Sequence, residues 1–553
     1  MLTSIITLLI VTLAAVLAQE PTVTYPGNNT VVGVAVSGGV NVYRKIPFAR
    51  PPAPIYLNDT NQFYNGTQYA PECIQSVNAG SEDCLYLAVY VPPGATNTSK
   101  LPVRHWIYGG SYTSGDYYSD GYYDGTALAA QTNTIVVASN YRVGILGFFV
   151  STTTINSSST GNYGLLDQQT ALRWTHENIA AFGGDPNNVT IFGESAGGSS
   201  VNFQLLMNGS WPYFRRAIIE SGGPWNFRTI KQLTALNDYL LNSLGLSNCD
   251  LACLQGLSVD LLANIPAVPF GQPVIDGTLI TDQPLNLWRA GKFKPNVELI
   301  IGINANEGTT LGSGSYAATA NLTAQGVFQS LNLAYNVDPT YANQLAAAYG
   351  FPQRWPVSPN VNTDSVYPVW ANFIGDYFIK CGNLGLAEFA VANNASVFTY
   401  YFYYNNNTRL GTYHSYEIAF VWNNTKFFNG GDTDGLVSQI FVDHFESFQN
   451  TGSPGADWQP YSQGNNNTFY IGGVSPFSGP FPRLATCDLI MPLLMNTYTP
   501  VTATGTGGTS SASATATGFT NSVTSNNPPT NSNDGARLTF ALFSIVVFVS
   551  LLV

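Results

Sequence analysis

A short segment near the middle of the chain has the residue types needed for nucleophilic catalysis. Gly193-Glu194-Ser195-Ala196-Gly197 places a serine between small residues, directly after the apolar run 189–192 and before the helix-compatible segment 196–207. A serine between a strand and a helix lies on a sharp turn, and small neighbours let the backbone pass close by. Ser195 is therefore a candidate nucleophile, and the alternative is a glycine-rich turn without chemistry.

A serine hydroxyl needs a base within hydrogen-bond reach, and the chain has four histidines. His105 lies in an expected strand, and His176 and His444 lie in expected helices, which suits packed or surface histidines. His414 follows an aromatic strand and a polar loop, and catalytic residues concentrate on such loops. Position alone favours His414 and leaves the other three open.

The acid of such a site is expected between Ser195 and His414, at the end of a strand. Glu307 directly follows the apolar run 297–304, and Asp276, in the segment 273–277, is the main alternative. For either carboxylate the simpler interpretation is a turn or helix cap, since Asp-Gly and Glu-Gly are common turn dipeptides.

The elements that would position these residues are short apolar strands alternating with helices. The strand-like segments are 101–110, 133–142, 188–195, 215–223 and 297–308. Near-continuous apolar strands, separated by segments long enough for helices, predict a mostly parallel sheet covered on both faces. The predicted class is therefore α/β, with functional sites at the carboxyl ends of the strands.

One of the connecting helices is expected over residues 167–183. Its apolar residues fall near one face at helical spacing, as the positions of Ala171, Trp174, Ile179 and Phe182 show.

Composition limits the classes of partner. The chain has 553 residues, of which 45% are hydrophobic and only 9% charged, with a net charge of −12. An acidic chain of this kind argues against nucleic acid or anionic membrane surfaces as partners.

The two ends of the chain differ from its body. Residues 1–18 are apolar and end in a small-x-small pattern, which predicts a signal peptide, so that the catalytic domain would span 19–499. Residues 500–533 are rich in Ser, Thr, Gly and Asn and predict a stalk. The apolar tail 534–553 predicts a glycosylphosphatidylinositol (GPI) attachment signal, with a short transmembrane anchor as the alternative. On this interpretation the protein is secreted and meets the membrane only through that anchor.

Together these motifs resemble the type-B carboxylesterases, a family that includes cholinesterases and secreted fungal lipases. The resemblance covers about residues 20–490 and rests on the segments 81–92, 107–115, 140–149, 161–198, 217–223, 273–277, 302–308, 413–422 and 448–455. It implies the α/β-hydrolase fold and a serine hydrolase that cleaves small-molecule carboxylic esters without a metal or an organic cofactor.

The resemblance also assigns roles. Ser195 looks like the nucleophile, Glu307 the acid and His414 the base. The backbone N–H groups that look like the oxyanion hole belong to Gly110, Ser111 and Ala196. Glu194 matches the family motif but is expected to be badly placed to orient the base.

Six cysteines fit an oxidising compartment, and sequence alone leaves their pairing open. The family pattern implies the disulfides Cys73–Cys84, Cys249–Cys253 and Cys381–Cys487. The first of these normally closes a longer flap, which forms a lid in lipases and carries a choline-binding tryptophan in cholinesterases. Here the interval is short and has no tryptophan, which argues against choline esters and against a large mobile lid.

The leading hypothesis is therefore a secreted or surface-anchored serine carboxylesterase. A lipase or sterol esterase is the alternative within enzymes, and the shortened flap counts against it. A non-catalytic, cholinesterase-like adhesion protein is the alternative outside enzymes, and the complete set of Ser195, Glu307 and His414 argues against it.

Overall fold

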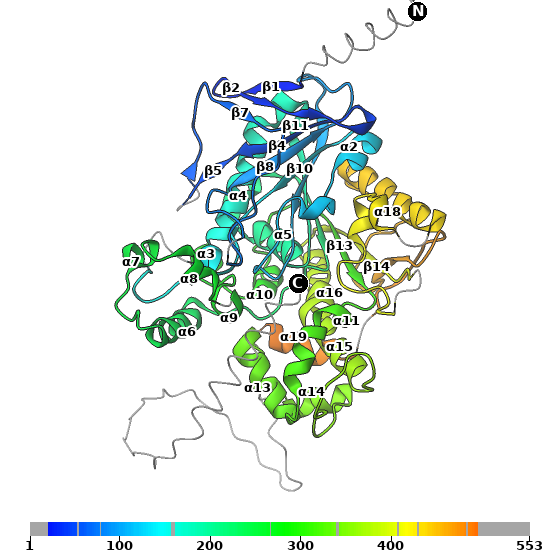
Figure 1. Cartoon of the computed structure of the whole chain (residues 1–553). Coiled ribbons are helices and arrows are strands. Elements are labelled where there is room, and N and C mark those ends of the chain that lie inside the picture. The colour runs from blue at the N-terminus through cyan, green and yellow to red at the C-terminus, as the bar shows by residue number, and fades with distance from the viewer. Residues whose placement is uncertain are drawn as a thin grey trace, which may run out of the picture.

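The apolar runs form the centre of one large sheet (Figure 1). The computed structural model describes residues 20–495, apart from 52–54, 78, 156–160, 266, 339–341, 406–408, 429–430 and 483–484. The expected signal peptide, stalk and tail lie outside the described residues.

The sheet has eleven strands in the order β16-β15-β14-β13-β12-β11-β9-β10-β8-β4-β3. From β15 to β10 all neighbours are parallel, while β16, β8, β4 and β3 pair antiparallel at the two edges. The bounds are β3 Val34–Ala35, β4 Asn41–Pro47, β8 Tyr86–Val91, β9 Leu101–Ile107, β10 Ile135–Ser139, β11 Gly184–Glu194, β12 Arg216–Glu220, β13 Glu298–Asn304, β14 Ser396–Phe402, β15 Asn467–Ile471 and β16 Phe477–Pro480. The mostly parallel α/β sheet expected from the sequence is thus present, with antiparallel strands added at its edges.

Helices cover both faces of this sheet, as two neighbouring residues of β9 show. His105 bonds to Thr175 of α4 (Tyr163–Asn178) at 2.9 Å, whereas the guanidinium of Arg104 donates to Gln449 of α18 (Asp432–Thr451). Successive side chains of a strand point to opposite faces, so α4 and α18 lie on opposite sides. Figure 1 shows α5 (Ala196–Leu206) beside α4 and, across the sheet, α18.

The helix expected over 167–183 is present as α4 followed by a 3₁₀ turn, Ile179–Phe182. The four apolar residues that define its inner face are buried: Ala171, Trp174, Ile179 and Phe182.

Smaller elements surround this core. Strands β1 (Thr22–Tyr25), β2 (Asn29–Val32) and β7 (Phe63–Asn65) form a separate sheet, and β5 (Ala49–Arg50) pairs with β6 (Ile55–Tyr56). The remaining α-helices are α2 Thr126–Thr132, α3 Gly144–Phe148, α6 Ile230–Ser243, α7 Leu251–Gln255, α8 Val259–Ala263, α9 Ala267–Phe270, α10 Pro284–Arg289, α11 Gly308–Leu311, α12 Ser313–Tyr316, α13 Ala324–Tyr335, α14 Ala342–Tyr349, α15 Tyr367–Gly375, α16 Cys381–Ala392, α17 Ile418–Val421 and α19 Cys487–Leu494. No helix in the described part of the chain is both long and apolar enough to cross a membrane.

One cross-strand pair in the parallel part of the sheet is unusually close. Gly302 of β13 lies opposite Tyr400 of β14, and a Cβ atom on Gly302 would lie 1.8 Å from Cζ of the tyrosine ring. The ring therefore occupies the space above the glycine, which only a residue without a side chain leaves open.

Candidate active site

Ser195 lies on a strained turn between β11 and α5. Its backbone has φ 59° and ψ −125°, a conformation that costs energy for a residue with a side chain. A Cβ atom on Gly197 would lie 2.0 Å from the carbonyl oxygen of Ile107. The small residues around Ser195 are thus required because the turn packs directly against β9.

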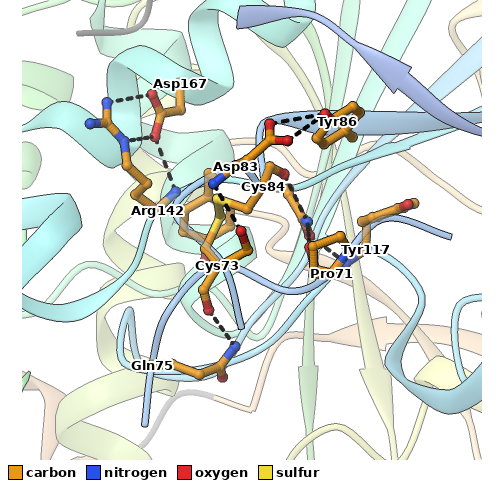
Figure 2. The surroundings of a disulfide bond; sticks show 12 residues. Pro71, Cys73, Gln75, Asp83, Cys84, Tyr86, Tyr117, Arg142 and Asp167 are labelled. Atoms are coloured by element: carbon orange, nitrogen blue, oxygen red, sulfur yellow. Dashed lines mark hydrogen bonds and ion pairs between the residues drawn. A yellow bond between two sulfur atoms is a disulfide. The ribbon is translucent and has the colours of Figure 1, made fainter. Parts of the chain in front are cut away.

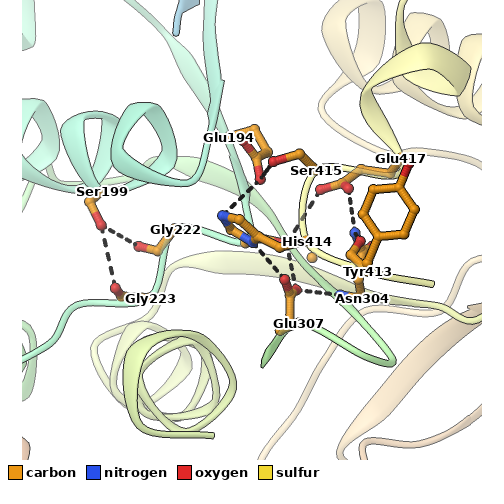
Figure 3. A network of polar contacts seen from close by, with 12 residues as sticks. Glu194, Ser199, Gly222, Gly223, Asn304, Glu307, Tyr413, His414, Ser415 and Glu417 are labelled. Carbon is orange, nitrogen blue, oxygen red and sulfur yellow. Dashed lines mark hydrogen bonds and ion pairs between the residues drawn. The ribbon is translucent and has the colours of Figure 1, made fainter. Parts of the chain in front are cut away.

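The structure brings His414 and Glu307 together (Figure 3). His414 lies in the loop after β14, and its Nδ1 atom is 2.7 Å from Oε2 of Glu307, which follows β13. Glu307 is fully buried, and its Oε1 atom accepts hydrogen bonds of 2.6 Å from the Ser221 hydroxyl and from the backbone N–H of Asn304. These bonds fix the carboxylate, which in turn fixes the imidazole.

Whereas Glu307 orients His414 through Nδ1, Glu194 lies beside Nε2 and, as expected, makes no hydrogen bond that orients the base. Its Oε1 atom is 3.2 Å from Nε2 of His414, without a well-aligned hydrogen bond, and accepts a 2.7 Å bond from the Ser415 hydroxyl. Among the described residues the Ser195 hydroxyl has no hydrogen-bond partner. Catalytic hydrogen bonds are often long or poorly aligned without substrate, so this geometry is compatible with Nε2 acting on Ser195.

The two carboxylates beside His414 determine the direction in which the pKa of its imidazole is shifted. Burial lowers the pKa of His414, but Glu194 and Glu307 outweigh it and raise the pKa from 6.5 to about 9. Burial also raises the pKa of Glu194 from 4.5 to about 7, while His414 and Ser415 act in the opposite direction. The charged imidazolium form of His414 is therefore strongly stabilised. The neutral form, which is the form that can accept a proton, becomes more populated as the pH rises.

Nucleophile, base and oxyanion candidates open into one cavity of about 430 Å³. Gly110, Ser111 and Ala196 line it, and within the described residues their backbone N–H groups donate no hydrogen bond. Backbone N–H groups without a partner among the described residues can stabilise a developing oxyanion. The loop that carries two of them is unusual, since both Gly110 (φ 106°) and Ser111 (φ 55°) have left-handed backbones.

The remaining wall of this cavity is mainly apolar. It includes Tyr122, Tyr123, Trp225, Leu311, Ile374, Phe378, Ile379 and Ile418. Of the tyrosines in 111–125, only the last two line the cavity; Tyr112 and Tyr117 pack in the core.

The disulfide Cys73–Cys84, shown in Figure 2, closes a short loop that supports the loop carrying Gly110 and Ser111. Gln75 clamps Gly115: its side chain accepts from the Gly115 N–H at 2.7 Å and donates to the Gly115 carbonyl at 3.2 Å. Described residues of this loop line a second cavity, not the one that contains Ser195. The other two bonds, Cys249–Cys253 and Cys381–Cys487, also have the pairing that the resemblance implied.

The alternative acid and bases have structural roles elsewhere. One oxygen of Asp276 accepts three backbone N–H bonds within its own turn, from residues 278–280. His105 is buried between Thr175 and Ser139, and burial lowers its pKa to about 3. Side chains of His176 and His444 bond to backbone carbonyls.

The polar groups behind the base were not predicted from the sequence. Glu417 accepts hydrogen bonds from Asn304 and, at 3.3 Å, from Ser221. Burial, with Glu194 and Glu307, raises its pKa to about 8. In the sequence, the feature that points to these groups is their position, because Ser415 and Glu417 closely follow the candidate base His414. Within the described residues no cluster of three or more His, Cys, Asp or Glu side chains is arranged to hold a metal ion.

The sequence is similar to a known family of enzymes along most of its length. The sequence model of the carboxylesterase family matches residues 20–475. Cholinesterase of Mus musculus is 34% identical over 442 residues, which cover 70% of this chain and 71% of that protein. Carboxylesterase 5A of Felis catus is 30% identical over 78% of this chain and 86% of its own length. Bile salt-activated lipase of Bos taurus is 29% identical over 78% of this chain and 80% of its own.

Proposed function

Because the chain belongs to the carboxylesterase family, and is thus a serine hydrolase of carboxylic esters, we propose that it works through an acyl-enzyme formed on Ser195. His414 is the general base and Glu307 the acid that orients it. The observation that carries this assignment is the 2.7 Å contact between His414 and Glu307 in the cavity that also contains Ser195.

In the first half-reaction Nε2 of His414 takes the proton of the Ser195 hydroxyl as its oxygen attacks the ester carbonyl. The N–H groups of Gly110, Ser111 and Ala196 bind the oxyanion. The tetrahedral intermediate then expels the alcohol, which receives the proton from the imidazolium. Water attacks the acyl-enzyme in the same way, with its proton passing to His414 and then to Ser195 as the acid is released.

Labelling with a fluorophosphonate probe tests this proposal. The probe should modify the wild type on the peptide containing Ser195, as mass spectrometry would show. Ser195→Ala should abolish both labelling and ester hydrolysis, whereas Ser243→Ala, which removes an exposed hydroxyl on α6, should leave both intact. Labelling that persists in Ser195→Ala would contradict the assignment.

The substrates are proposed to be small neutral esters with apolar groups, because aromatic and aliphatic side chains form most of the cavity wall. The loop between Cys73 and Cys84 brings no tryptophan to the site, so recognition of a quaternary ammonium group at that position is not expected. Initial rates on p-nitrophenyl esters of increasing acyl length, compared with butyrylcholine, test this. Preference for the choline ester would contradict it.

Export and anchoring are proposed as well. The apolar segment 1–18 supports entry into the secretory route, and all six cysteines are paired, as suits an oxidising compartment. The polar segment 500–533 and the apolar tail support a GPI anchor. Phosphatidylinositol-specific phospholipase C should release the enzyme from cells, and an intact tail peptide in the mature protein would exclude this anchor.

A further inference from the structure

The residue after the base has a strained backbone and a specific polar contact. Ser415 has φ 71°, in the left-handed region that favours glycine. Its hydroxyl donates a 2.7 Å hydrogen bond to Oε1 of Glu194, the same oxygen that lies 3.2 Å from Nε2 of His414 (Figure 3). A side chain kept at a strained position, and bonded to a buried carboxylate, suggests a role for that side chain.

We propose that Ser415 is a positioning residue that fixes the carboxylate of Glu194 beside Nε2 of His414. This inference rests on the proposed function, in which His414 is the base. With Glu194 held in place, the imidazolium that forms during acyl transfer lies between two carboxylates, Glu307 on its Nδ1 side and Glu194 near its Nε2 side.

Few contacts keep Glu194 ionised. Glu194 is fully buried, and among the described residues Ser415 and the charge of His414 counteract the effect of that burial on its pKa. Loss of the Ser415 hydroxyl should therefore favour the neutral acid, because hydrogen bonds to a carboxylate stabilise its charged form. The other titratable groups around the pair are Glu307, Glu417, Glu220, Tyr122, Tyr123 and Tyr400.

Loss of the Ser415 hydroxyl should let His414 act as a base at lower pH. His414 must be neutral to accept the Ser195 proton, so kcat/KM falls as pH drops through its pKa. A neutral Glu194 no longer stabilises the imidazolium, and the pKa of His414 then decreases. Ser415→Ala should consequently move the acid limb of the kcat/KM profile to lower pH, by about one unit.

The test compares pH profiles of kcat/KM, measured on a soluble short-chain ester, for Ser415→Ala, Ser415→Gly, Glu194→Gln and the double variant Ser415→Ala/Glu194→Gln. The alanine and glycine variants should shift the acid limb alike, although glycine relieves the backbone strain. Glu194→Gln should shift it further, and the double variant should match Glu194→Gln, because Ser415 acts only through Glu194.

Thr412→Val is the matched control. It removes another hydroxyl of the same loop, which donates to the carbonyl of Tyr404 at 2.8 Å, and should change stability without moving the acid limb. An unchanged or upward-shifted limb in both Ser415 variants would overturn the inference, as would an equal shift in the Glu194→Gln background. Fluorophosphonate labelling of each variant separates the two proposals: labelled enzyme with an unshifted limb refutes only the role of Ser415, and wild type that is not labelled refutes the proposed mechanism.

Discussion

Replacing Glu307 by glutamine preserves its shape and should nevertheless disable the base. Two donors converge on Oε1 of Glu307, the Ser221 hydroxyl and the Asn304 N–H, each at 2.6 Å, while Oε2 faces Nδ1 of His414. An amide has one acceptor oxygen and one donor nitrogen. The amide oxygen must therefore take the side with two donors, and its NH₂ group must face the imidazole.

His414 then presents the lone pair of Nδ1 to the amide and carries its proton on Nε2. That tautomer cannot accept a proton from Ser195. A wrong tautomer of this kind costs about 10⁴-fold in kcat, or about 5 kcal/mol of transition-state stabilisation.

Steady-state hydrolysis of p-nitrophenyl butyrate measures this loss, with Asp276→Asn as the matched control. An asparagine oxygen can still accept the three backbone N–H bonds that Oδ1 of Asp276 accepts, while its NH₂ group replaces Oδ2 and loses the 3.1 Å bond from the Asn162 amide. This variant should therefore lose some stability but keep kcat close to that of the wild type, because Asp276 does not contact His414. If kcat of Glu307→Gln stays within about tenfold of wild type, or if Asp276→Asn is the more damaging change, the acid has been misassigned.

Three further predictions concern stability and kinetics. Gly302→Ala should lower the free energy of unfolding by about 3 kcal/mol through overpacking against Tyr400, whereas Gly435→Ala in α18, where a Cβ atom meets nothing within 4 Å, should raise it by about 0.5–1 kcal/mol; denaturant titration checks both. Removing Cys381–Cys487, which links residues 106 apart, should cost about 4–5 kcal/mol, and removing Cys249–Cys253, which spans 4, should cost about 2 kcal/mol in the same assay. Hydrolysis of tributyrin should saturate smoothly through its solubility limit, because the disulfide and the two Gln75–Gly115 hydrogen bonds hold the short 73–84 loop and we expect no open state for it; a sharp rise there would reveal a lid elsewhere.

Much of the sheet was predictable from sequence because its central strands are continuous apolar runs. Strands such as β10 and β12 are buried along their whole length, and burial on both faces is what such runs indicate. The antiparallel edge strands were not predicted. β3 has two residues and β16 four, too few for a hydrophobic period, although each pairs with the strand next to it in the chain, β4 and β15.

Within the site, local motifs could be recognised in the sequence, but the contacts between distant loops could not be predicted from it. The turn at Ser195 could be inferred from its small neighbours. The contact between Glu194 and His414 could not, because it depends on how the loop after β14 meets the end of β11, 220 positions earlier in the chain (414 minus 194). Likewise, Asp276 and Glu307 both precede a glycine, and only their hydrogen-bond partners distinguish a turn residue from the partner of a base.

The close approach of Tyr400 to Gly302 restricts how this sequence can change over evolutionary time. Any side chain at position 302 would collide with the ring of Tyr400. Replacement of the glycine is therefore expected to be selected against as long as the aromatic residue is present. Exchange of the fully buried tyrosine for a smaller residue would leave a void beside the sheet. The two positions can therefore diverge only together, and among related sequences we expect them to covary.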